Sequence, residues 1–131
     1  MPQRDIELIL LRQLASSLAI PIWVADAEGH LIFYNESAET ILGRRFDEAG
    51  EMSLEEVSAL FEIRDDDGEP IPPSDIPLGI ALLERRPAHR RMQMRGLDGP
   101  WRTVDVTAFP IEGQGGRFLG AAVLFWEVAD A

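Results

Sequence analysis

Between residues 20 and 35, two short runs of β-branched and aromatic side chains flank a polar turn. The runs Ile20–Val24 and Leu31–Tyr34 have strand character, and Gly29 in the turn can adopt a positive φ without steric cost. Asn35 follows directly and precedes a short apolar-periodic segment that has acidic residues in its first turn and ends at Gly43. The pattern predicts a β-hairpin followed at once by a helix that Asn35 caps.

Residues 5–18 carry apolar side chains at helical spacing on two adjoining stripes. One stripe is enough to dock a helix on its own domain, so the second favours contact with another chain. Deep burial of both stripes on the helix's own sheet is the alternative. We expect residues 1–18 to form an amphipathic dimerisation or capping helix, residues 19–128 a single domain and residues 129–131 a tail. The two stripes are Ile6, Ile9, Leu10 and Leu14, and Leu8, Leu11, Ala15 and Leu18.

The middle of the chain predicts short helices separated by turns. Leu54–Phe61 has helical periodicity, and Asp65–Gly68 forms a tight acidic turn before a proline-rich extended stretch. A second helix is expected to start at Ser74 and Asp75, which can cap it, and to run to about Glu84.

From residue 88 the period becomes alternating, which predicts strands. In 88–95, Met92 and Met94 share one face while polar residues occupy the other, and 101–110 alternates in the same way after a turn at 97–100. The last strand, 118–126, is apolar on both faces, as is the first, so both are expected in the middle of the sheet. The N-terminal helix is expected to cover the second face over Trp23, Leu124 and Trp126.

This order of two strands, several short helices and three strands, with the first and last strands adjacent, resembles that of PAS domains. The resemblance covers roughly residues 14–128. It implies an α+β fold with a five-stranded antiparallel sheet in the order 2-1-5-4-3, short helices on one face that enclose a small pocket, and an N-terminal amphipathic helix. The residues that carry it are Val24–Gly29, Phe33–Ala38, Leu42-Gly43, Pro77-Leu78 with Ala81-Leu82, and Asp98-Gly99 through Val104, Val106 and Pro110 to Gly120.

Composition narrows the classes of partner. The chain has 131 residues and a formal net charge of −11, which disfavours nucleic acid or an anionic membrane as partner. No apolar run approaches the roughly 20 residues that span a bilayer, and we expect a cytoplasmic protein. The complete absence of cysteine excludes disulfides and zinc thiolate sites.

The PAS resemblance also bears on cofactors, whose identity the sequence leaves unknown. Relatives that sense blue light form a flavin adduct with a cysteine in the helix after the hairpin, and residues 35–42 contain none, so this adduct is excluded. Relatives that bind haem use a histidine from the long helix, and residues 74–86 contain none. His89 lies just beyond and is expected on the polar face of its strand, so haem is not expected. The family commonly ends its last strand with an Asp-Ile-Thr-like triplet, where this chain has Glu127-Val128-Ala129.

The resemblance implies a sensory or interaction module of bacterial-type signal transduction, homodimeric and acting on an effector domain or protein. Two hypotheses stay open: a sensor that binds a small apolar, fatty-acid-like ligand, and a ligand-free dimerisation or docking module whose core is filled. The interface expected between the two copies of a homodimer consists of Leu8, Leu11, Ala15, Leu18, Trp23, Leu124 and Trp126. For a ligand, the expected apolar pocket is lined by Leu60, Phe61, Ile76, Ile80, Leu83, Met92, Met94, Val104, Val106, Val123 and Phe125.

Catalysis and metal binding are the alternatives from other classes. Small α+β cone folds place an Asp, a His and a Tyr in an apolar pocket for proton transfer. In this chain both histidines are expected at the surface, so we expect no enzyme and no catalytic residues. The acidic run that starts at Asp65 lacks the bidentate Glu of a calcium loop, because Ile76 occupies the twelfth position, and no metal site is expected. The residues that a cone-fold enzyme would draw on are Asp26, Asp105, Tyr34, His30 and His89.

Overall fold

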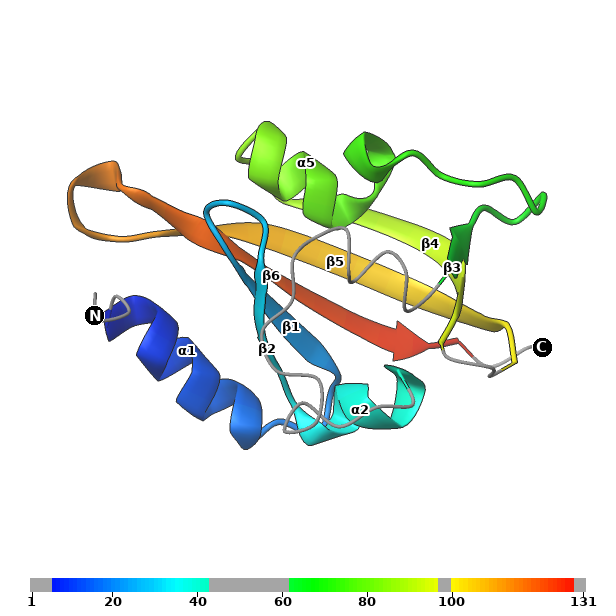
Figure 1. Ribbon diagram of the computed structural model, residues 1–131, viewed down its shortest axis with the longest axis horizontal. Helices are drawn as coiled ribbons and strands as arrows, with labels where there is room; N and C mark the ends of the chain where they lie inside the picture. Colours follow the sequence, from blue (N-terminus) through cyan, green and yellow to red (C-terminus); the bar gives the residue numbers. More distant parts are fainter. Residues whose placement is uncertain (1–5, 43–61, 97–99, 129–131) are drawn as a thin grey trace.

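The computed structural model describes residues 6–42, 62–96 and 100–128. Its centre is a six-stranded antiparallel sheet in the order β2-β1-β6-β5-β4-β3 (Figure 1). The predicted helix 54–61, most of the turn 97–100 and the tail 129–131 lie outside the described residues. The strands are β1 (Ile22–Asp26), β2 (Leu31–Tyr34), β3 (Glu62–Arg64), β4 (Ala88–Arg95), β5 (Arg102–Glu112) and β6 (Phe118–Glu127).

The predicted order of five strands is confirmed, because β2-β1-β6-β5-β4 is the predicted 2-1-5-4-3 with the first and last strands side by side. The additional strand is β3 at the edge, where Ile63 pairs with Met94. This strand has three residues and one apolar side chain, so it is too short to show an alternation of apolar and polar residues.

Among the described residues, the helices are α1 (Ile6–Ser16), α2 (Glu36–Leu42) and α5 (Pro77–Leu83), with a 3₁₀ turn at Pro73–Asp75. Gln114–Gly116 form a turn between β5 and β6 in which Gly115 has φ +72°. The prediction of one helix from Ser74 to about Glu84 is wrong in its first turn. Ile76 is extended, with φ −80° and ψ 154°, because the ring of a following proline disfavours the helical region for the residue before it. The α-helix therefore begins at Pro77.

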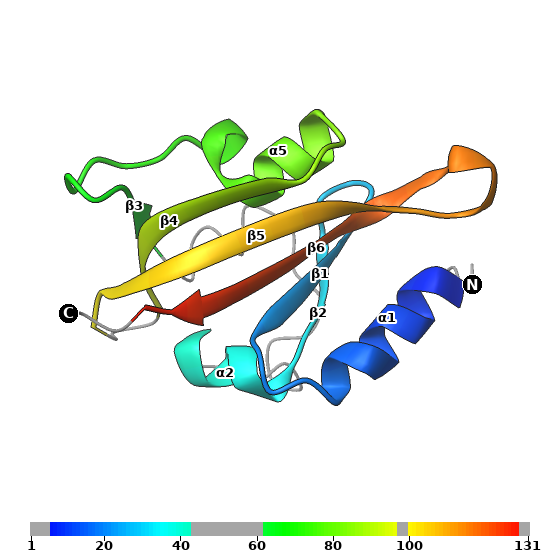
Figure 2. The same ribbon diagram turned by 180° about the vertical axis from the view of Figure 1, so that it is seen from behind.

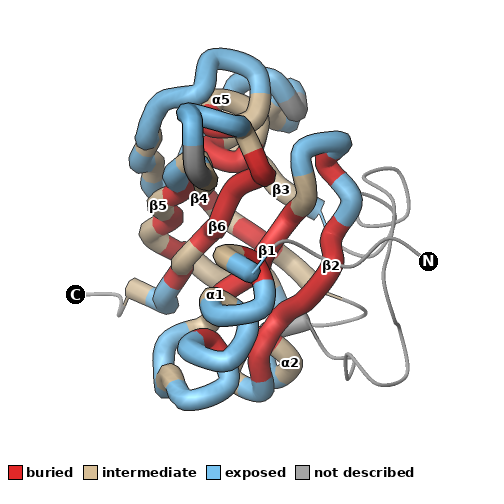
Figure 3. Tube along the Cα trace, turned by 90° about the vertical axis from the view of Figure 1, so that its left-hand side faces the viewer, coloured by how far each residue is buried: buried red, intermediate tan, exposed pale blue. Residues whose placement is uncertain are grey.

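The two faces of the sheet are covered by different helices, α5 on one side and α1 on the other (Figures 1 and 2). We call these the α5 face and the α1 face. Figure 3 shows β1, β2 and β6 buried between them over most of their length. The buried residues of the α5 face include Trp23, Tyr34, Leu78, Ala81, Met92, Met94, Val104, Val106, Val123 and Phe125. Those of the α1 face are Leu8, Ala15, Ile22, Val24, Ile32, Phe33, Leu119 and Ala122.

Only one of the two apolar stripes of α1 docks on the sheet. Leu8 and Ala15 are buried in the α1-face cluster, with Leu11 and Leu18 packed beside them. The side chains of the other stripe remain outside: Ile6 is 66% exposed, Ile9 38%, Leu10 56% and Leu14 57%. One helix face therefore has a partner within the described part of the chain and the other is at the surface.

The expectation that α1 covers Trp23 is wrong. Alternation along β1 puts Ile22 and Val24 on the α1 face and Trp23 on the α5 face, where its ring meets that of Phe125 edge-on with centroids 5.3 Å apart. Leu124 does pack against the α1-face cluster, and Trp126 is 40% exposed.

The hairpin and the cap that follows it are confirmed. Gly29 has φ +89° in the turn, and the amide of Ala38 donates a hydrogen bond of 3.1 Å to Oδ1 of Asn35. The amide of Ile22 donates to the same oxygen at 3.2 Å. The side chain of Asn35 thus holds the start of β1 and the start of α2 together.

Candidate ligand-binding pocket

A cavity of about 510 Å³ lies between α5 and the face of the sheet that this helix covers. Its floor consists of side chains that point to this face from four neighbouring strands, because β1, β4, β5 and β6 each alternate. The floor residues are Trp23 of β1, Met92 and Met94 of β4, Val106 of β5, and Val123 and Phe125 of β6.

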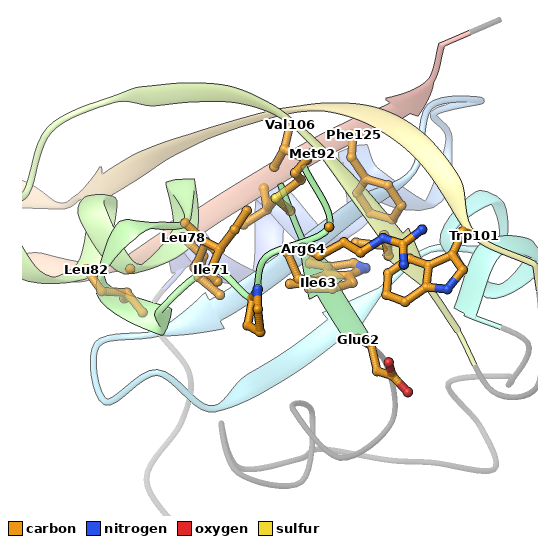
Figure 4. A pocket seen from close by; sticks show the side chains of 17 residues that line it. Glu62, Ile63, Arg64, Ile71, Leu78, Leu82, Met92, Trp101, Val106 and Phe125 are labelled. Atoms are coloured by element: carbon orange, nitrogen blue, oxygen red, sulfur yellow. The ribbon is translucent and has the colours of Figure 1, made fainter. Parts of the chain in front are cut away.

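The walls come from α5 and from the segment that leads to it. Leu78 and Leu82 lie one helical turn apart and face the sheet together with the fully buried Ala81. Ile71 and Ile76 extend the wall before the helix, and Ile63 closes it from β3 (Figure 4). Most of the lining is apolar, which is typical of sites for small molecules.

The cavity brings together six of the residues that the sequence predicts for a pocket: Ile76, Met92, Met94, Val106, Val123 and Phe125. Val104 is buried in the same cluster without lining the cavity. Ile80 does not line it, and Leu83 is 71% exposed. Leu60 and Phe61 lie outside the described residues. Leu82 takes the expected place of Leu83, because Leu78 and Ala81 set the inward face of the helix.

The sequence did not predict several other lining residues. The sequence pattern places Trp23 on the opposite face, since β1 is apolar on both sides and has no polar residue that marks its orientation. Ile63 and Arg64 belong to β3, which had no detectable period. Ile71 stands alone between two prolines, and this single apolar residue was the available signal. For Trp101 the sequence indicates only that a strand begins there.

One end of the cavity is polar and aromatic (Figure 4). The guanidinium carbon of Arg64 lies 3.7 Å from the centroid of the Trp101 ring, and that of Arg95 lies 5.2 Å from the same centroid. Nε of Arg64 donates a hydrogen bond of 2.6 Å to Oε1 of Gln93. Nη2 of Arg95 pairs with the carboxylate of Glu62, whose side chain points away from Arg64 in Figure 4.

On the side of the sheet away from the cavity, β4 and β5 carry a cluster of ion pairs. Nε and Nη2 of Arg91 donate to the two carboxylate oxygens of Asp105 at 3.1 and 3.2 Å. This bidentate hydrogen bonding holds the pKa of Asp105 below its usual value and raises that of Arg91. Nε2 of His89 lies 3.8 Å from the same carboxylate, and its ring is stacked at a tilt on Trp126, 6.4 Å between centroids. His89 therefore lies on the side of the sheet away from the cavity.

The residues that a cone-fold enzyme would use do not converge. Oδ1 of Asp26 accepts hydrogen bonds from the amides of Glu28 and His30, so this carboxylate closes the hairpin turn. Tyr34 is buried in the α5-face core, and Asp105 belongs to the cluster of ion pairs on the other side of the sheet. None of the five candidates lines the cavity.

The acidic turn is built as expected. Oδ1 of Asp65 accepts from the amides of Asp67 and Glu69 at 2.9 and 3.0 Å. Among the residues that the structure describes, no three His, Asp or Glu side chains gather as a metal site would require. In the same residues, no helix has the length and apolar character needed to cross a bilayer.

Comparison with known proteins agrees with this architecture. The PAS domain of Bordetella pertussis BvgS superposes with a TM-score of 0.65 at 19% identity, covering 95% of this chain and 87% of the other. The PAS domain of nitrogen regulation protein NR(II) from Vibrio parahaemolyticus gives 0.65 at 18% identity over 91% and 98% of the two chains. The Rhodobacter sphaeroides LOV protein gives 0.73 at 11% identity over 95% and 69%.

At these identities the solved structures show the fold alone. The search of curated proteins finds no match. The sequence model described as PAS fold matches residues 15–131, which is most of the chain. The chain therefore belongs to the PAS fold family, whose members are generally sensory modules.

Proposed function

We propose that this chain is a sensory module of a signal-transduction system and that it binds a small, largely apolar molecule in the cavity between α5 and the sheet. The observation that carries the proposal is the cavity itself, since about 510 Å³ is within the usual range for small-molecule sites. Its floor contains Met92 and Met94, whose flexible thioethers adapt to guests of different shape.

A signal can pass from this cavity to the opposite face through β1 and β6. Trp23 and Val123 line the cavity, while Val24 and Leu124, the next residue on each strand, pack in the α1-face cluster. A guest that shifts either strand therefore changes the surface on which α1 is docked. We propose this displacement of α1 as the output that an effector reads.

We further propose that a second copy of the chain packs on the exposed stripe of α1. Ile6, Leu10 and Leu14 follow one another at intervals of four residues, and each is more than half exposed. A two-fold dimer that uses this apolar ridge on each subunit buries it on both subunits at once. In such a dimer, Leu8 and Ala15, which the sequence predicts for the interface, pack on the sheet of their own subunit.

The ligand test is native mass spectrometry of the purified protein, followed by organic extraction and small-molecule mass spectrometry. We expect a stoichiometric apolar guest, and a reduced amount with Val106→Phe, which adds volume at the cavity floor. Circular dichroism and thermal melting check that this variant is folded. A wild-type protein that is empty and binds no neutral apolar dye contradicts the ligand proposal and favours a ligand-free docking module.

The dimer test is light scattering after size-exclusion chromatography. Leu10→Glu with Leu14→Glu should give a monomer at concentrations where the wild type is a dimer. The matched control is Gln13→Glu, which adds a charge at an exposed polar position of the same helix. A wild-type monomer, or a double variant with unchanged mass, contradicts the dimer proposal.

A further inference from the structure

We propose that the guest of the cavity is a monocarboxylate with an apolar body, and that Arg64 binds its carboxylate. This inference rests on the proposed function, and it adds the chemical class of the ligand and the residue that recognises its charged end.

The backbone of Arg64 is held on both sides at the rim of the cavity. It pairs with Gln93 in the β3–β4 ladder and forms an antiparallel bridge with Pro70 on its other side. A side chain that starts from a backbone fixed in this way emerges in a defined direction. Arg64 therefore belongs to the wall of the cavity and is not a residue of a free loop.

The guanidinium plane is also fixed. Stacking on Trp101 at 3.7 Å orients one face of the group, and the hydrogen bond from Nε to Oε1 of Gln93 at 2.6 Å fixes its rotation. These two contacts use one face of the guanidinium and one of its five N–H donors. They leave the two terminal nitrogens, which form the fork that binds a carboxylate through two parallel hydrogen bonds.

No carboxylate of the described residues neutralises the charge of Arg64. Arg95 also lies over the ring of Trp101, but it forms an ion pair with Glu62. The carboxylate of Glu62 therefore balances the charge of Arg95. Within 6–42, 62–96 and 100–128, no carboxylate forms an ion pair with Arg64. In a chain of net charge −11, the guanidinium at the end of this apolar cavity thus has no carboxylate partner among the residues that the structure describes.

The rest of the described lining favours a ligand with one charged end. Apart from Nε1 of Trp23, which is a neutral donor, the floor and the helical wall are hydrocarbon, thioether and aromatic surface, and they offer little to a second charged group. Burying such a group without a hydrogen-bond partner is costly. A dicarboxylate is therefore disfavoured, whereas a fatty or arylalkyl acid satisfies both the guanidinium and the apolar walls.

The test measures competition against N-phenyl-1-naphthylamine, a neutral dye, by octanoate, decanoate and dodecanoate, each compared with the alcohol of the same length. At least one acid should bind the wild type about tenfold or more tightly than its alcohol, since hydrogen bonds to charged groups contribute this much. Arg64→Gln should remove that difference between acid and alcohol, and Arg64→Lys should retain part of it.

The control variant is Arg86→Gln, which removes a guanidinium from an exposed pair with Glu84 and should change neither affinity. Equal binding of acids and alcohols by the wild type, or an unchanged preference in Arg64→Gln, overturns the role of Arg64 and leaves the apolar site intact. If dye, acids and alcohols all fail to bind the wild type, the proposed ligand function fails as well.

Discussion

Nδ2 of Asn35 donates a hydrogen bond of 3.0 Å to the carbonyl oxygen of Ala15, twenty residues earlier in the chain. The same nitrogen lies 3.3 Å from the carbonyl oxygen of Leu18 and 2.9 Å from that of Ile20. The side chain of Asn35 is buried and its oxygen accepts from the amides of Ile22 and Ala38. One amide group therefore ties the end of α1 to the first strand and to the start of α2.

Asn35→Ala should lower the free energy of unfolding by about 2–3 kcal/mol, because it removes a helix cap and leaves buried backbone groups without partners. Chemical denaturation monitored by tryptophan fluorescence measures this change. The matched control is Ser37→Ala, which removes one exposed hydrogen bond to the carbonyl of Ala19 and should cost about 0.5 kcal/mol or less. Equal effects of the two substitutions would contradict the role of Asn35 as a junction.

Asp105→Asn should make stability less dependent on pH at the acidic end. The hydrogen bonds from Arg91 depress the pKa of Asp105, so the ionised carboxylate stabilises the fold above the pKa of the unfolded chain, about 4. This contribution is lost as the pH falls through the lower pKa of the folded state. The Tm of the variant should therefore lie below that of the wild type at pH 7, and the gap should narrow below about pH 4.

The control for this pH dependence is Glu84→Gln, since Glu84 takes part in an exposed pair with Arg86. Exposed pairs contribute little, so its Tm should follow that of the wild type across the same range. A gap for Asp105→Asn that is constant from pH 7 to pH 3 would show that the effect is not linked to ionisation.

Gly120→Ala should disrupt the pairing of β6 with β1. Gly120 has φ +147° opposite Asp26, and a methyl group there would collide with the carbonyl oxygen of Ala25 and lie 2.9 Å from Cα of Asp26. Both neighbours are backbone atoms of a central strand, so the expected loss is about 3 kcal/mol or more. Thermal and denaturant unfolding test this expectation.

Gly68→Ala is the control, because it introduces the strain of a positive φ without a steric clash between the new methyl group and its neighbours. Gly68 has φ +85° in the acidic turn, and no heavy atom of the described residues lies within 4 Å of an added Cβ. Only the left-handed conformation is then penalised, at about 1 kcal/mol. A loss at Gly68 as large as that at Gly120 would contradict the account of a close approach between β6 and β1.

The parts of the fold that the sequence predicted are those with local signals. The turn at Gly29, the cap at Asn35 and the alternation of Met92 and Met94 each depend on residues adjacent in the chain. The central position of β1 and β6 followed from their apolar residues on both faces. That same property concealed which face Trp23 occupies, because a strand without polar residues gives no orientation.

The parts of the site that were missed depend on tertiary contacts. Arg64 lies in a three-residue edge strand that exists because β4 offers it a partner, and its position beside Trp101 joins segments far apart in the chain. The expectation for Leu83 failed because packing on the sheet turns the side of α5 that carries Leu78, Ala81 and Leu82 inward, and spacing along the chain does not show which side of a helix packs.

Leu82 and Leu83 provide a direct test of the cavity. Leu82 lines it from α5, whereas Leu83, the next residue, is 71% exposed. Leu82→Gln should weaken binding of a neutral apolar dye about tenfold, because it replaces hydrocarbon in the wall by an amide. Leu83→Gln should leave the affinity within about twofold, as expected of a surface position. Both leucines are replaced by the same good helix former, so a difference in helix propensity cannot account for the contrast. Fluorescence titration measures both affinities, and equal losses would show that the dye does not bind between α5 and the sheet.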